Sequence, residues 1–164
     1  MYEEPTFDPP PGWELLTLPR KFGVGRSFVS GETGGDRLRV YYYMDENKAL
    51  CALAWWGQGA EGPPGHAHGG SMAAVLDEGM GFAAWLAGSP VVAASITVDF
   101  EKRLPLWAVL EVRTHVRDAE GSKVNTSGRI QSRDGSEVYA RAKGLFVKRP
   151  REEFGTFADG FNQQ

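Results

Sequence analysis

The sequence predicts an α+β fold in which a curved antiparallel β-sheet wraps one long helix. Two observations carry this prediction. Between Ser71 and Leu86 the apolar residues recur at intervals of three and four, which is helical spacing. Over most of residues 37–148 outside that segment, apolar residues instead occupy alternate positions, as in strands with one buried face. A helix that is apolar nearly all round must be covered on most sides, and a curved sheet is the simplest cover.

Two strands are expected before the helix. From Arg37 to Met44 apolar and polar residues alternate, which predicts a half-buried strand. The run from Ala49 to Trp56 is apolar on both faces and suits a central strand. A loop containing Pro63 and Pro64 then leads to the helix.

Four strands are expected after the helix. Apolar residues alternate in segments 92–100, 106–117, 124–130 and 138–146. Turn sequences at Glu120-Gly121 and Asp134-Gly135 separate the last three, which therefore form an antiparallel meander. Residues 1–36 are expected to form an N-terminal arm packing on this domain of residues 37–148, and residues 149–164 a polar tail. Because a single sheet leaves its edges and part of the helix open, we expect a homodimer.

Composition excludes several classes of function. The 164 residues include 18 Lys and Arg against 21 Asp and Glu, so the net charge is −3 and nucleic acid is an unsuitable main partner. Local basic clusters could still hold a small phosphorylated ligand. The sequence has no membrane-spanning run, and its start lacks the features of a signal peptide. One cysteine, Cys51, and no zinc-ligand spacing predict a cytoplasmic protein without a metal or cofactor.

The segment from Gly62 to Ser71 contains the residues best suited to chemistry. It enters the helix through His68-Gly69-Gly70, and a helix start presents unpaired N–H groups that can hold an anion or an oxyanion. The same glycines also fit a tight loop with no chemical role, and His68 also fits a loop histidine bonded to backbone.

Asp77 is the second candidate, because an unpaired carboxylate among apolar residues is costly to bury. It could instead lie with Glu78 on a solvent-exposed stripe. Asp77 lies on the order of 10 Å along the helix from its start, too far to act on a carbonyl held by Gly69. Either the two residues serve different functions, or Asp77 of a second subunit completes the site.

Three motifs together resemble a known family. His68-Gly69-Gly70, the acidic Asp77 nine residues after the histidine, and the strand end from Phe100 to Leu106 are similar to the hotdog-fold, PaaI-like acyl-CoA thioesterases. The Gly62-to-Gly65 lead-in resembles the thioesterase superfamily member 4 type within that group. The resemblance covers about residues 37–148.

The resemblance implies a hotdog homodimer, often a dimer of dimers, that hydrolyses medium- or long-chain acyl-CoA without a metal. It implies that the Gly69 N–H polarises the thioester carbonyl, that His68 positions the group, and that Gly70 shapes the turn. Asp77 of the other subunit is implied as base or nucleophile. Lys102 and Arg103 are placed to meet the CoA phosphates.

One position departs from the family. Related proteins have Thr or Ser where this chain has Ala93, a side chain that helps to hold the catalytic water. Ser95 would point to the same face if the strand is regular, and could substitute. The departure keeps open a non-catalytic acyl-CoA-binding protein, and the pair His68 and Asp77 could also imitate a hotdog hydratase or dehydratase.

Overall fold

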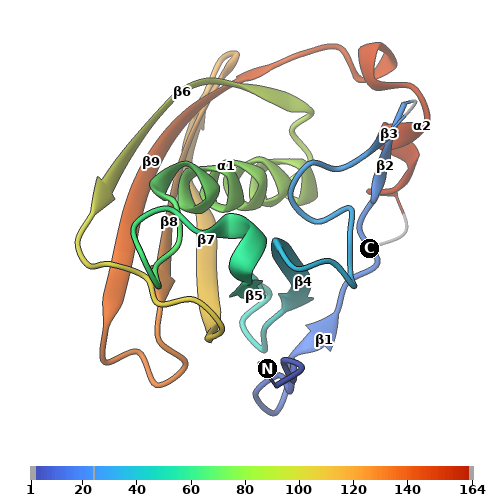
Figure 1. Ribbon diagram of the computed structural model, residues 1–164. Helices are drawn as coiled ribbons and strands as arrows, with labels where there is room; N and C mark the ends of the chain where they lie inside the picture. Colours follow the sequence, from blue (N-terminus) through green and yellow to red (C-terminus); the bar gives the residue numbers. More distant parts are fainter. Residues whose placement is uncertain (1–2, 24, 163–164) are drawn as a thin grey trace.

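The computed structural model of the protein describes residues 3–23 and 25–162. Its main feature is a strongly curved, fully antiparallel sheet whose hollow holds one long helix (Figure 1). The strands follow one another across the sheet in the order β1 (Glu14–Leu15), β4 (Leu38–Met44), β5 (Leu50–Trp56), β7 (Val109–Glu120), β8 (Lys123–Gln131), β9 (Val138–Lys148) and β6 (Val91–Phe100). The predicted α+β class and its wrapped helix are confirmed.

Helix α1 (Gly69–Leu86) packs its apolar side chains against the concave face of the sheet. Small residues let the helix approach closely. A Cβ added at Gly79 on α1, or at Gly128 on β8, would lie 3.0 Å from Cγ2 of Thr114 on β7. Any larger residue at these two positions would therefore push the helix away from the sheet.

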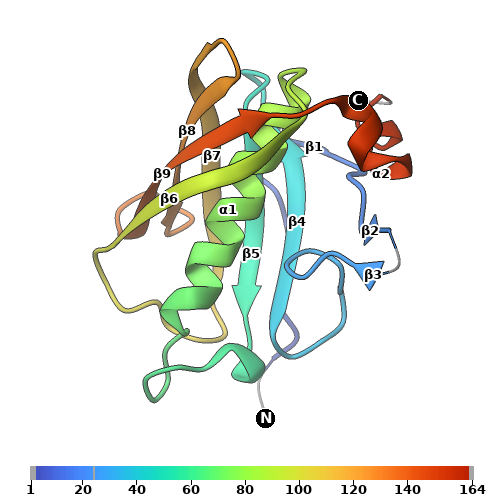
Figure 2. The same cartoon turned by 90° about the horizontal axis from the view of Figure 1, so that it is seen from above.

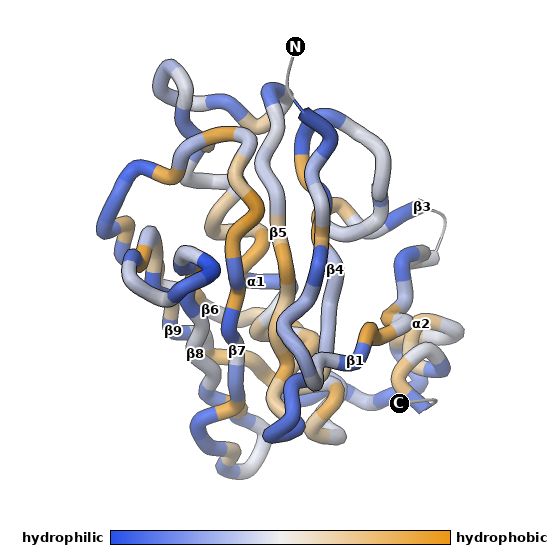
Figure 3. Tube along the Cα trace, turned by 90° about the horizontal axis from the view of Figure 1, so that it is seen from below, coloured by the Kyte–Doolittle hydropathy of each residue, from blue (hydrophilic) through white to orange (hydrophobic). Residues whose placement is uncertain are grey.

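The expected strands are all present, and the hairpins β7–β8 and β8–β9 form the predicted meander. Along β7 hydrophobic and hydrophilic residues alternate, as Figure 3 shows. The helix begins at Gly69, two residues before the periodic segment, and His68 caps it. Periodicity could not show this, since glycines carry no apolar signal.

The N-terminal arm adds strand β1 to the edge of β4. Phe7 and Trp13 pack on Tyr41 and Tyr43, with ring centroids 4.7 and 5.7 Å apart, and thereby cover the outer face of β4. Farther along, β2 (Lys21–Phe22) and β3 (Gly25–Arg26) pair as a small ribbon. A short 3₁₀ helix, η1 (Gln58–Ala60), follows β5.

The C-terminal segment contains η2 (Arg151–Phe154) and α2 (Thr156–Asp159), and it lies beside the β2–β3 ribbon (Figure 2). The rings of Phe154, Phe157 and Phe161 surround Trp85 of α1 at centroid distances of 4.7, 5.1 and 4.9 Å. The prediction of a polar tail missed this aromatic contact, and the domain boundaries at 36 and 148 stay predictions.

At the far edge of the sheet, β6 has only β9 as a neighbour among the described strands. Three large apolar side chains on it are exposed: Val92, Ile96 and Phe100. None of the helices in the described ranges is both long and apolar enough to span a bilayer.

Candidate active site

The start of α1 is organised by His68. Its Nδ1 accepts a hydrogen bond from the Gly70 N–H at 2.9 Å, and its carbonyl accepts one from the Ser71 hydroxyl at 2.6 Å. His68 is thus the N-cap of the helix. This agrees with the alternative prediction that His68 is bonded to backbone. Because Nδ1 is the acceptor, a neutral ring carries its proton on Nε2, which is left as a donor.

Gly69 keeps a free N–H at this helix start. As the first helical residue it has no acceptor within the helix, and no acceptor for it is found elsewhere in residues 3–23 and 25–162. Gly70, by contrast, has already used its N–H on His68. Of the two glycines, only Gly69 can offer a backbone donor to a bound carbonyl.

Gly69 opens onto a depression of about 280 Å³, which we call the helix-start depression. Lys102 and Arg103 line it, so the chain brings these two predicted cations next to Gly69. Lys102 also pairs with Glu137 at 2.8 Å. The Phe100 ring lies over Gly69, where an added Cβ would be 3.3 Å from the ring. A ligand anion can therefore meet both a helix N-terminus and positive charge.

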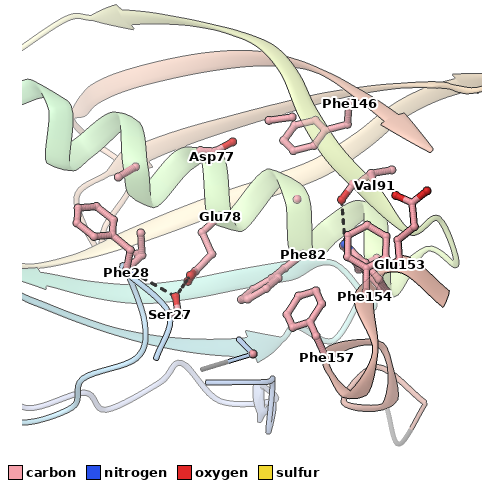
Figure 4. A pocket seen from close by; sticks show the side chains of 16 residues that line it. Ser27, Phe28, Asp77, Glu78, Phe82, Val91, Phe146, Glu153, Phe154 and Phe157 are labelled. Carbon is pink, nitrogen blue, oxygen red and sulfur yellow. Dashed lines mark hydrogen bonds between the residues drawn. The ribbon is translucent and has the colours of Figure 1, made fainter. Parts of the chain in front are cut away.

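Asp77 lies in a different, larger cavity of about 600 Å³, which we call the Asp77 cavity. Its walls are mostly apolar, and Figure 4 shows aromatic side chains at both ends of it. Among the described residues no donor bonds the Asp77 carboxylate, and burial raises its pKa. A half-buried carboxylate with a raised pKa and no partner is suited to take up a proton.

The neighbouring Glu78 has a structural role. It accepts hydrogen bonds from the Ser27 hydroxyl of the arm and, at 3.0 Å, from the Tyr42 hydroxyl. In Figure 4 Glu78 points to Ser27 while Asp77 leaves the other side of the helix. Two carboxylates that are adjacent in sequence therefore have separate tasks, because neighbouring helix positions differ by about 100°.

Asp77 and Gly69 do not meet within one chain. The helix-start depression and the Asp77 cavity share no lining residue. Eight helical residues separate the two positions, which is about 12 Å along the axis. Within one chain the two cavities are therefore separate.

Strand β6 places Ala93 in the Asp77 cavity but not Ser95. A bulge lies between them: Ala93 pairs with Phe146, and Ser95 pairs with the adjacent Leu145. Paired residues share a face of the sheet, so Ser95 lies on the opposite face from Ala93. The expectation that Ser95 replaces the missing hydroxyl assumed a regular strand and is wrong on this point.

The sequence reasoning missed several walls of the Asp77 cavity. Phe28 and Val29 of the arm line it, as do Phe154 and Phe157 of the C-terminal segment. Neither segment has a clear period. The one available signal was the spacing of Phe154, Phe157 and Phe161, which suits one face of a helical turn.

This architecture is the hotdog fold: one long helix lies in the hollow of an antiparallel sheet, and β4 and β6 are the first and last of the six main strands across that sheet. The solved structure of the E. coli PaaI protein from the phenylacetic acid degradation operon matches this architecture. Its TM-score is 0.61 at 18% identity, over 68% of this chain and 80% of that one.

Sequence comparison finds similarity to thioesterases. The model described as Thioesterase superfamily matches residues 64–139. Acyl-coenzyme A thioesterase THEM5 of Mus musculus is 35% identical over 142 residues, 86% of this chain and 53% of that protein. Acyl-coenzyme A thioesterase THEM4 of Xenopus laevis is 37% identical over 109 residues, 66% of this chain and 49% of that protein. The chain is therefore similar in sequence to the thioesterase superfamily and to acyl-coenzyme A thioesterases of the THEM4 and THEM5 type, and it spans about half the length of these curated relatives.

Proposed function

We propose that the protein is an acyl-CoA thioesterase that hydrolyses medium- or long-chain acyl-CoA to a free acid and CoA. The observation that carries this proposal is that the chain has a free Gly69 N–H in one cavity and, in another, an Asp77 carboxylate without a partner among the described residues. The two relatives named as acyl-coenzyme A thioesterases support the substrate class.

The helix-start depression of one chain and the Asp77 cavity of another form one site when two chains associate. The unpaired edge of β6 with its exposed Val92, Ile96 and Phe100 is a suitable surface for a homodimer. Gly69 of one subunit then faces Asp77 of the other. Association of two such dimers is a further step of the same proposal.

In the proposed reaction Asp77 acts as base, taking a proton from a water whose oxygen attacks the thioester carbon. The carbonyl oxygen gains negative charge and is held by the Gly69 N–H, with the His68 Nε2–H as a second donor. One backbone donor of this kind is worth about 3 kcal/mol in other enzymes. Collapse of the intermediate breaks the C–S bond, and the CoA thiolate leaves and takes up the proton that Asp77 removed from the water. Direct attack by Asp77, through an anhydride that water then hydrolyses, is the alternative role.

The substrate is proposed to lie across both cavities. The apolar walls of the Asp77 cavity suit an acyl chain, and its 600 Å³ gives room for a medium or long one. Lys102 and Arg103 suit the phosphate end of CoA. The single buried Cys51 agrees with a reducing compartment, so we propose the cytoplasm, testable by cell fractionation.

A non-catalytic acyl-CoA-binding protein is the second candidate, because Ala93 lines the Asp77 cavity without a hydroxyl. The test is release of free thiol from acyl-CoAs of increasing chain length. Hydrolysis that is lost in Asp77→Asn and kept in Glu120→Gln, an exposed carboxylate on β7, supports the thioesterase. Tight binding without thiol release selects the binding protein, and hydration of crotonyl-CoA selects the hydratase.

A further inference from the structure

We infer that the outer face of the sheet carries a second ligand site, which binds a small molecule with at least two phosphate groups. The site lies across β7, β8, β9 and β6, on the face turned away from α1. It is a depression of about 380 Å³, here called the outer-face depression, and five cationic side chains line it: Arg113, Arg117, Arg129, Arg141 and Lys143. The inference does not depend on the proposed thioesterase activity.

The strand register places like charges directly opposite one another. Arg113 on β7 pairs with Arg129 on β8, and Arg129 pairs with Arg141 on β9. Three arginines therefore form one row across three neighbouring strands. Like charges in directly opposed positions destabilise a sheet, so this row costs stability unless an anion lies on it.

The ends of the row are compensated and its middle is not. Arg113 pairs with Asp45 at 2.8 Å and with Glu111, and Arg141 pairs with Glu101 at 2.7 Å. Asp99, an acidic residue that lines the depression, lies on β6 directly opposite Arg141. At the centre, Arg129 donates to the neutral Gln131 amide oxygen, and no acidic partner for it is found in the part of the chain that the structure describes.

A second row continues the positive field. His115, Ser127 and Lys143 are paired across β7, β8 and β9, beside the arginine row. Neither Lys143 nor Arg117 has an acidic partner within residues 3–23 and 25–162. The Ser127 hydroxyl bonds His115 Nε2 at 2.9 Å and adds a polar group to the floor. Planar guanidinium groups beside an ammonium and a hydroxyl are the donors that phosphate prefers.

A second copy of the chain is a poor occupant. A symmetric contact through this face would bring the same cations against one another, which is unfavourable. The N-terminal arm already covers the outer face of β4 with Phe7 and Trp13, and the Trp13 ring also lies 4.9 Å from the Arg113 guanidinium, at the β7 end of the arginine row. A small polyanion satisfies the arginine row without repulsion, and the size of the depression limits it to a few phosphates.

The test uses the full chain and inorganic pyrophosphate, with binding followed by calorimetry at low salt. We expect pyrophosphate to bind, and the double variant Arg129→Gln with Lys143→Gln to bind it at least tenfold more weakly. A control with the same loss of charge elsewhere, Arg26→Gln with Lys148→Gln, keeps the affinity within about twofold. Affinity falls as salt is raised.

Two further measurements test the outer-face depression. The Arg129→Gln variant should melt at a higher temperature than the parent without ligand, since repulsion is removed, and this also shows that it folds. Competition with CoA distinguishes the sources of phosphate: displacement assigns the site to the nucleotide end of CoA, and no displacement assigns it to a separate phosphorylated ligand. Absence of pyrophosphate binding, or binding lost only in Lys102→Gln with Arg103→Gln, overturns the inference.

Discussion

His68 Nδ1 accepts a hydrogen bond from the Gly70 N–H at 2.9 Å, and this bond gives Gly69 and Gly70 different roles at the start of α1. Gly70 is used to cap the helix, so Gly69 is the residue whose N–H stays available. The proposed oxyanion donor is thus a single, identifiable backbone group, and it can be removed without deleting a side chain.

Replacing Gly69 with proline removes that N–H, and it also adds a side-chain ring next to Phe100. Proline is tolerated at the first position of a helix, and His68 before it is already extended, at ψ 132°. We expect Gly69→Pro to lower kcat by roughly 10²- to 10³-fold, the usual cost of one oxyanion donor. Steady-state kinetics on an acyl-CoA, with melting curves to confirm folding, provide the measurement.

The matched control is Gly69→Ala, which adds a Cβ against the same Phe100 ring but keeps the N–H. It should lose far less activity than the proline variant. Equal losses in the two variants would mean that crowding against Phe100, and not the missing donor, limits the reaction.

Asp77 should cost stability at neutral pH. Burial raises the pKa of its carboxyl in the folded state above the ordinary value of 3.8, so the folded chain binds this proton more tightly than the unfolded chain. Stability is therefore lost as pH rises from the unfolded pKa through the folded one. We expect Asp77→Asn to melt at a higher temperature than the parent at pH 7, and this gap to close below pH 3.8. Melting curves at both pH values check this, and a parent that is more stable than the variant at pH 7 contradicts it.

Ser27 should hold the arm against the Asp77 cavity. Its hydroxyl donates to Glu78 and accepts the N–H groups of Val29 and Ser30, both at 3.2 Å. Ser27→Ala removes all three bonds, although Glu78 keeps the one from Tyr42, at a cost of about 1–3 kcal/mol. Because Phe28 and Val29 line the cavity, KM for long-chain substrates should rise more than KM for short ones. The exposed Ser122→Ala serves as control, and an unchanged chain-length profile would separate the arm from substrate binding.

Sequence periodicity predicted the helix and all six main strands, because apolar residues recur at three and four along the helix and alternate along most strands, while β5 is one continuous apolar run. It failed where the orientation or role of a side chain depends on one irregular residue or on a partner far away in the sequence. The bulge after Ala93 turns Ser95 to the other face, and alternation of residue types does not reveal it. The structural role of Glu78 depends on two distant partners, Tyr42 and Ser27, and Ser27 lies 51 residues away in an arm without a clear hydrophobic period.

Whether two chains build one active site is tested most directly by subunit complementation. Gly69→Pro and Asp77→Asn are produced on differently tagged chains, and mixed dimers are purified through both tags. Each variant alone should be inactive. In a mixed dimer one of the two sites combines an intact Gly69 with an intact Asp77, so about half of the parental rate should return. Mixed dimers as inactive as either parent variant would contradict a site shared between subunits.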